Sequence, residues 1–433
     1  MQIEEDLLPG SFNEQATPGP SVLADSYAAV RQFTGRLCKP LEIEDYVIQT
    51  MPDVSPTKWH LAHTTWFFET FVLREHAADY RLLHTAYPYL FNSYYVQAGE
   101  RYYRPERGLL SRPTVRDVFD YRAYVDEHMG RLLASIPEER SHEIGRLVRI
   151  GLNHEQQHQE LLLTDVKHVL AKNPLQPVYS EGLVGHSALP PSLQWAPFEG
   201  GLCEFGYEGD GFFYDNEGPR HRQYTEPFEM ASRLVTNREY MEFIEAGGYA
   251  NPNIWLSEGW ATAERDGWQA PLYWEQVNGT WFSFTLSGFR EVDPDEPVTH
   301  VSYFEADAFA RWADARLPTE FEWELAADGC TIQGNFVETG HFHPVPAAHR
   351  EEPLHQVFGD VWEWTRSPYS PYPGYLPEPG ALGEYNGKFM CNQFVLRGGS
   401  CATSRSHVRS TYRNFFHPAA RWQFSGIRLA RDV

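Results

Sequence analysis

The segment GLNHEQQHQELLLTD, residues 151–165, has the apolar spacing of an amphipathic helix. His154, Gln157 and His158 follow one another at intervals of three and one residues, so a helix places them on one face. Two imidazoles one turn apart can bind a single metal ion. The same spacing serves zinc proteases, in which a Glu between the histidines is the general base. We expect no such role for Glu155.

A second segment, SPTKWHLAHTTWFFE at residues 55–69, predicts another helix of the same bundle. Ser55 followed by Pro56 indicates an N-cap and a first helical position. On this helix His63 shares the apolar face with Trp59 and Trp66, so its imidazole is expected to point inward.

Inward histidines on two helices of one bundle favour a metal site in its core. We therefore predict that His63, His154 and His158 bind one ion, with His60 as an alternative ligand. Three neutral imidazoles leave the ion with open positions but do not distinguish iron(II) from zinc(II).

The chain divides into two halves with different patterns. The first half is expected to form a four-helix bundle, and its helical segments are residues 27–41, 57–73, 115–136 and 141–171. The connection 79–113 is long and aromatic, which is typical of a functional loop. Residues 1–25 are expected to be a flexible extension, residues 26–172 the bundle, residues 173–197 a linker and residues 198–433 an irregular α+β domain. Only residues 236–248 and 303–315 are clearly helical in that second domain.

Composition excludes several classes of function. A net charge of −23 argues against nucleic acid as a partner, because phosphate binding requires a basic surface. The five cysteines are widely spaced and contain no C-x-x-C pair, which favours a reduced, cytoplasmic setting. There is no uninterrupted run of 18 apolar residues, so no membrane span is predicted.

Four motifs, taken in order, resemble the ergothioneine-biosynthesis sulfoxide synthases of the EgtB type. They are SPTKWHLAHTTWFFE, FNSYYVQAGERYYRPERGLLSRPTV (91–115), NHEQQHQELLLTD (153–165) and LRGGSCATSRSHVRSTYRNFFHPAARWQFSGIRLARD (396–432). The resemblance implies a DinB-like four-helix bundle followed by a formylglycine-generating-enzyme-type domain with a C-type-lectin-like core. It also implies that iron(II) and dioxygen couple a thiol to carbon 2 of the hercynine imidazole as a sulfoxide.

The resemblance assigns site residues to the first half. The implied iron ligands are the three histidines already selected, and Gln157 is the implied contact of the substrate imidazole. Arg101 and Arg104 match the basic pair that holds the carboxylate of the thiol substrate. Guanidinium groups suit carboxylates because they bind them in a bidentate manner.

The second half is expected to supply the wall that holds the trimethylammonium group of hercynine. Asn414, Phe415 and Phe416 match that wall, and aromatic faces suit a cation without N–H donors. Mycobacterial-type members have a tryptophan and then an aspartate that contacts γ-glutamylcysteine. Because this chain has two phenylalanines instead, we expect free cysteine as the thiol donor.

The catalytic acid is expected to be a tyrosine. Mycobacterial-type members take it from the second domain, but no tyrosine of SPYSPYPGYLPEPGALGEYNGKF (367–389) aligns with that position. Tyr94 and Tyr95, in the long loop of the bundle, are the candidates that we select.

Other functions are also compatible with the sequence. One is an ovothiol-type synthase that couples cysteine to carbon 5 of histidine, and another is a DinB-type hydrolase or thiol transferase with zinc or nickel. A formylglycine-generating enzyme is disfavoured because that activity needs two cysteines near the RGGS segment, where only Cys401 occurs. A lectin-like half that merely binds a partner would predict no dioxygen uptake.

Overall fold

The computed structural model describes residues 20–181, 189–349 and 351–433, and they form two compact units. The first unit contains the chain up to Leu175 together with two short segments from further along, Gly209–Phe212 and Pro377–Tyr385. The second unit contains the remainder. Residues 1–19 of the expected N-terminal extension lie outside the described residues, and the first helix begins at Pro20.

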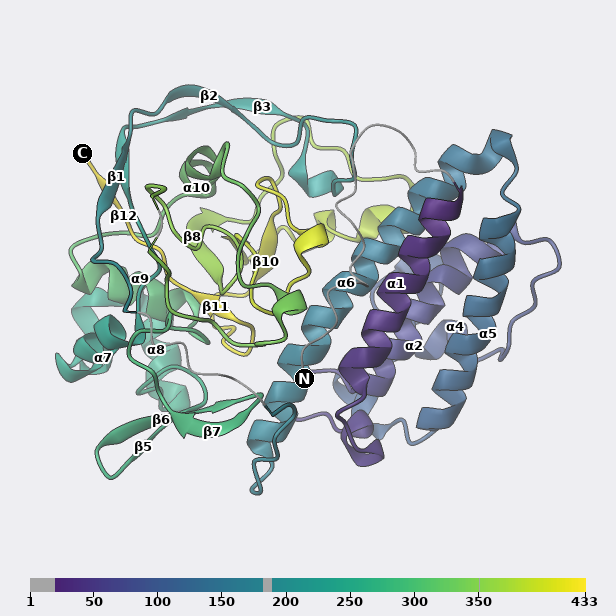
Figure 1. The fold of residues 1–433 in the computed structure, drawn as a ribbon, viewed down its shortest axis with the longest axis horizontal. Helices are drawn as coiled ribbons and strands as arrows, with labels where there is room; N and C mark the ends of the chain where they lie inside the picture. The colour runs from purple at the N-terminus through teal and green to yellow at the C-terminus, as the bar shows by residue number, and fades with distance from the viewer. Residues whose placement is uncertain (1–19, 182–188, 350) are drawn as a thin grey trace. The chain divides into compact units, whose positions relative to one another are not determined.

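The first unit has all four of the expected long helices, which are seen side by side in Figure 1. They are α1 (Pro20–Cys38), α2 (Thr57–Phe68), α5 (Val115–Ala134) and α6 (Ser141–Lys172). Helix α2 continues through a π-helical turn, Glu69–Leu73, into the short α3, Arg74–His76. Both α1 and α2 pack against α5 and α6.

The long connection between α3 and α5 is only partly regular. It contains α4 (Tyr87–Leu90) and two 3₁₀ turns, Val96–Ala98 and Arg104–Leu109. The Thr114 side chain caps α5 by accepting a hydrogen bond from Asp117 N, which fixes where the loop ends.

Helices α2 and α6 approach closely at Gly151. A Cβ atom at this position would lie 2.5 Å from Phe68 Cε1 and 3.1 Å from Phe67 Cδ1. Because real side chains do not tolerate such distances, glycine lets the two helices meet one turn before His154.

In the part of the chain that the structure describes, the second unit combines four α-helices with four small sheets. The helices are α7 (Asn237–Glu245), α8 (Ser257–Asp266), α9 (Tyr303–Trp312) and α10 (Glu320–Ala327). The strands are β1 (Trp195–Phe198), β2 (Gly201–Phe205), β3 (His221–Thr225), β4 (Phe228–Ala231), β5 (Trp274–Val277), β6 (Thr280–Thr285), β7 (Gly288–Glu291), β8 (Trp362–Pro368), β9 (Phe394–Arg397), β10 (Asn414–Phe416), β11 (Ser425–Gly426) and β12 (Ala430–Asp432).

The strand orders are β1-β4-β12, β10-β9-β8-β11, β2-β3 and β5-β6-β7. The pairs within these sheets are antiparallel, except that β11 lies parallel to β8. Short strands in several small sheets agree with the irregular α+β domain expected from the sequence.

The prediction of only two helices in the second half is wrong, because α8 and α10 are also present. The buried residues of α8 are Gly259, Thr262 and Ala263, so this helix lacks a stripe of large apolar side chains. In α10 the acidic residues Glu320, Glu322 and Glu324 are buried, which removes the usual polar face. Within the described residues, no helix is long and apolar enough to cross a membrane.

Candidate metal centre

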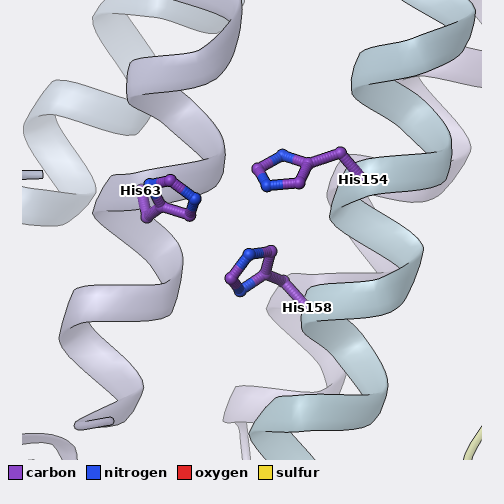
Figure 2. Close-up of side chains that lie close together, drawn as sticks. All are labelled: His63, His154 and His158. Atoms are coloured by element: carbon purple, nitrogen blue, oxygen red, sulfur yellow. The ribbon is translucent and has the colours of Figure 1, made fainter. Parts of the chain in front are cut away.

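Two helices of the first unit direct three imidazoles toward one point (Figure 2). His63 projects from α2, and His154 and His158 project from α6. Each offers one ring nitrogen, and these three atoms lie within 4.8 Å of one another. The structure therefore brings together the three residues that the helix faces selected.

The ring of His63 is held by two stacked tryptophans and by a hydrogen bond at one nitrogen. Trp59 and Trp66 stack on it at centroid distances of 4.6 and 5.5 Å, each tilted by 14°. Its Nδ1 lies 2.6 Å from the carbonyl oxygen of Phe91, so Nδ1 carries the proton and donates it. Nε2 is left with a lone pair, is buried and has no hydrogen-bond partner among the described residues.

His154 is even more isolated from protein donors and acceptors. Its ring packs on Phe67 at 4.7 Å, and within the described part of the chain neither ring nitrogen has a hydrogen-bond partner. Buried polar atoms normally find partners, so such atoms call for a ligand. A metal ion would satisfy them.

Burial keeps the three imidazoles in the neutral form that binds metals. It lowers the pKa of His154 to about 3, and it lowers the pKa values of His63 and His158 well below their ordinary value. Three neutral nitrogen donors suit iron(II) or zinc(II). A bound ion would keep its full positive charge, which favours anionic substrate groups.

His60, the alternative ligand, contacts other residues. Its Nδ1 lies 2.8 Å from Nδ1 of His158, and its Nε2 lies 2.9 Å from Oδ2 of Asp165. His60 therefore contacts the candidate ligand His158 at Nδ1 of that imidazole.

Residues 154–158 spell H-E-x-x-H, yet Glu155 is not placed as a general base. Its carboxylate accepts hydrogen bonds from Arg31 (2.9 Å), Arg122 (2.6 Å) and Thr34 (2.6 Å). Burial alone would raise the pKa of Glu155, but the two guanidinium groups outweigh it and hold the pKa at about 2. This carboxylate joins α6 to α1 and α5.

Ser55 does not cap α2, as the sequence suggested, because Pro56 occupies the N-cap and no side chain caps the helix. The Ser55 amide donates to Asp165 Oδ2 at 2.8 Å, and its hydroxyl accepts from Arg107 Nη1 at 2.9 Å. The guanidinium of Arg107 lies 3.3 Å from the ring centroid of Trp59 and also donates to Ser93 Oγ. The sequence analysis missed Arg107, although it continues the three-residue spacing of Arg101 and Arg104.

Arg101 and Arg104, the predicted carboxylate pair, are exposed in the first unit. Arg104 donates to the carbonyl oxygen of Asp53 at 2.5 Å, which attaches this turn of the loop to the chain ahead of α2. Exposed guanidinium groups are available to an anionic ligand.

A tyrosine that the sequence analysis did not select lies beside the histidines. Tyr385 belongs to the segment Pro377–Tyr385 of the first unit, and its ring packs on His154 at 5.7 Å. Its hydroxyl donates a hydrogen bond to Gln157 Oε1. The segment is held in place by Glu384, whose carboxylate accepts from the amides of Val96 and Gln97 at 2.8 Å.

The two predicted tyrosines lie in the same aromatic group. Tyr94 stacks on Tyr95 at 4.6 Å and packs edge-on against Tyr385 at 6.2 Å. Tyr95 is fully buried and packs against Trp66 and Phe71. Three phenol groups therefore lie close together in the first unit, and that of Tyr385 donates to Gln157.

Asn414, Phe415 and Phe416 form β10 of the second unit and are half-buried there. The ring of Phe415 stacks against those of Tyr369 (4.1 Å) and Phe389 (5.9 Å). Such a layered aromatic wall suits a quaternary ammonium group.

The chain is similar to known proteins over nearly its whole length. Residues 26–162 match the DinB superfamily, and residues 194–353 and 347–433 match the sulfatase-modifying factor enzyme 1-like domain. The chain is 33% identical over 443 residues to the hercynine oxygenase of Mycolicibacterium smegmatis, covering 95% of this chain and 99% of the relative.

A second hercynine oxygenase, from Mycobacterium tuberculosis, is 32% identical over 444 residues, covering 96% of this chain and 99% of the relative. The ergothioneine biosynthesis protein 1 of Schizosaccharomyces pombe is 26% identical, over 51% of this chain and 28% of the relative. The expected architecture, a DinB-like helical unit followed by a domain of the formylglycine-generating-enzyme type, is confirmed.

Proposed function

The chain belongs to the hercynine oxygenase family, and from this premise we propose that it is an iron(II)-dependent sulfoxide synthase. It couples the thiol of free cysteine to carbon 2 of the hercynine imidazole and consumes one dioxygen. The observation that carries the proposal is the set of buried nitrogens of His63 and His154 that have no hydrogen-bond partner within residues 20–181, 189–349 and 351–433, beside a third imidazole.

The reaction balances with dioxygen as the sole oxidant. The S–H bond of cysteine and the C2–H bond of the imidazole break, and a C–S bond and an S–O bond form. One oxygen atom becomes the sulfoxide oxygen and the other leaves as water. Iron(II) held by three imidazoles supplies open positions for substrate and dioxygen, together with one-electron redox chemistry.

The residues of the chain bind the substrates and move a proton. Gln157 is proposed to contact the hercynine imidazole, because it follows His154 on the same helix face and lies beside Tyr385. Arg101 and Arg104 are proposed to bind the cysteine carboxylate. The aromatic wall of β10 is proposed to bind the trimethylammonium group.

Tyr385 is the strongest candidate for the proton donor, ahead of Tyr94 and Tyr95, because its hydroxyl already serves as a donor beside the histidines. A donor at the reacting oxygen favours release of water and C–S bond formation. Without it, both oxygen atoms can pass to sulfur and give cysteine sulfinate, which needs no hercynine.

The test is reconstitution with iron(II) without air, followed by air, hercynine and either cysteine or γ-glutamylcysteine, with mass analysis of the product. We expect hercynylcysteine sulfoxide from cysteine and one dioxygen consumed per product. Product from γ-glutamylcysteine alone would refute the thiol assignment, and product from histidine in place of hercynine would indicate the ovothiol-type reaction. Absence of dioxygen uptake with every pair, in iron-loaded protein, would refute the oxygenase proposal.

A further inference from the structure

A chain of three polar side chains runs from a buried carboxylate to the candidate ligand His158. Asp165 Oδ2 lies 2.9 Å from His60 Nε2, and His60 Nδ1 lies 2.8 Å from His158 Nδ1. Both Asp165 and His60 are buried. The same carboxylate oxygen also accepts from the amide of Ser55 at 2.8 Å, which fixes its position.

With a neutral His60, only one placement of protons satisfies both hydrogen bonds between these three side chains. The Asp165 carboxylate can only accept, so His60 must donate from Nε2. His60 Nδ1 then carries the lone pair and accepts the proton of His158 Nδ1. His158 is thereby fixed in the tautomer whose Nε2 carries a lone pair, which is the form that binds a metal.

The helices supply this geometry from both sides. His158 and Asp165 are seven residues apart, two turns of α6, and therefore lie on one face. His60 comes from α2, one turn before His63, and its ring reaches between the two α6 residues. Helix α2 thus contributes one candidate ligand and also holds the ring of another.

We propose that His60 and Asp165 are positioning residues that fix the tautomer and ring orientation of the metal ligand His158. They bind no metal themselves. The proposal rests on the assignment of His158 as a ligand in the proposed function. It parallels the role of the Phe91 carbonyl oxygen, which fixes the tautomer of His63 in the same way.

Two variants of His60 test the proposal, one that keeps a hydrogen-bond acceptor for His158 and one that removes it. In His60→Asn the amide oxygen replaces Nδ1 and can still accept from His158. In His60→Leu neither nitrogen has a replacement, so His158 loses its acceptor and can place its proton on Nε2. His168→Leu is the matched control, because His168 is a buried histidine of α6 whose Nδ1 bonds Thr50 Oγ1 at 2.6 Å.

The measurements are the apparent dissociation constants for Fe(II) and Co(II), taken anaerobically, and the visible absorption of the Co(II) protein. Loss of a residue that orients a metal ligand typically weakens metal binding by roughly 10–100-fold. We expect a weakening of that size in His60→Leu, with altered Co(II) bands, a smaller one in His60→Asn and none in His168→Leu. Apo-protein unfolding midpoints establish that the variants are folded.

Unchanged metal affinity and Co(II) bands in folded His60→Leu would overturn the proposal. Equal losses in His60→Leu and His168→Leu would also overturn it, because they would indicate a packing effect. These readouts need no turnover, so a wild-type protein that binds metal but makes no sulfoxide would refute the proposed reaction alone. If His158→Ala kept full metal affinity, the ligand assignment itself would fail.

Discussion

Two buried polar clusters, one in each unit, differ in how their charges are compensated. In the second unit, the carboxylate of Glu320 accepts from Arg397 at 2.9 Å and from Arg413 at 2.7 and 2.9 Å. In the first unit, His63 Nε2 and both nitrogens of His154 have no partner among the described residues. The paired cluster stabilises the fold, whereas the unpaired nitrogens indicate a ligand that the protein must bind.

Burial leaves Glu320 charged but keeps His154 neutral. It would raise the pKa of Glu320, but the guanidinium groups of Arg413 and Arg397 outweigh it and the pKa is lowered. At His154 burial dominates and the pKa falls to about 3. One site keeps its charge by pairing and the other stays neutral, ready to donate lone pairs to a cation.

The comparison predicts its largest effect at the metal centre. His158→Ala should lose its iron, because two imidazoles cannot retain the ion in place. The rate of turnover should fall with it by more than about 1,000-fold. Its apo form should unfold near the wild-type midpoint. Iron content and product formation are the measurements, and full activity in this variant would refute the ligand assignment.

Removal of one partner from the paired cluster should reduce stability and spare the metal. Arg413→Met leaves the Glu320 carboxylate buried with one guanidinium fewer, and breaking a buried pair in this way costs about 3–5 kcal/mol. Chemical denaturation measures the free energy of unfolding. A loss of less than about 1 kcal/mol in the free energy of unfolding would contradict the structural role. A changed iron affinity in the folded protein would show that this cluster also affects the metal centre.

Tyr385→Phe should change the product more than the amount of oxygen consumed. Loss of a general acid lowers a rate by typically 10²–10⁴-fold, so we expect sulfoxide formation to fall by about 100-fold and cysteine sulfinate to rise. Tyr94→Phe and Tyr95→Phe are the matched variants from the same aromatic group. An unchanged partition in Tyr385→Phe, with sulfinate appearing in Tyr94→Phe or Tyr95→Phe, would return the role to the tyrosines that the sequence selected.

Low pH should reduce the stability that the Glu320 cluster contributes to the fold. Because the folded pKa of Glu320 is lowered, its contribution to stability is fully present above the unfolded value of about 4.3 and is lost as the pH falls through the folded pKa. Glu320→Gln removes this titration, so its unfolding midpoint should depend less on pH below about 4.5 than that of the wild type. Identical pH slopes for the two proteins would contradict the lowered pKa.

Local periodicity was sufficient to predict the histidine cluster. His154 and His158 are one turn apart and His63 lies on an aromatic helix face, so the helical repeat alone places all three inward. His60 was visible only as an alternative ligand, because nothing in the spacing shows that Asp165 lies beside it. Its contacts depend on the close approach of α2 and α6, which Gly151 permits.

Tyr385 could not be placed from the sequence, because it lies more than 200 residues after His158 along the chain. Only the fold shows that Pro377–Tyr385 belongs to the first unit. The sequence of helix α10 contains one signal of a helix start, the capping box formed by Thr319 and Glu322. The arginine partners of the buried Glu320 and Glu324 come from distant parts of the chain, so the sequence does not show that these two acidic side chains lie inward.

The most direct test of the account is an anaerobic Fe(II) titration of the wild-type protein and of His63→Ala, His154→Ala and His158→Ala. We expect one tightly bound iron per wild-type chain, and binding weaker by about 100-fold or more in each variant with apo unfolding midpoints close to the wild-type value. A wild-type chain that binds no iron, or variants that bind it as tightly as the wild type, would contradict the claim that these three imidazoles form a metal centre.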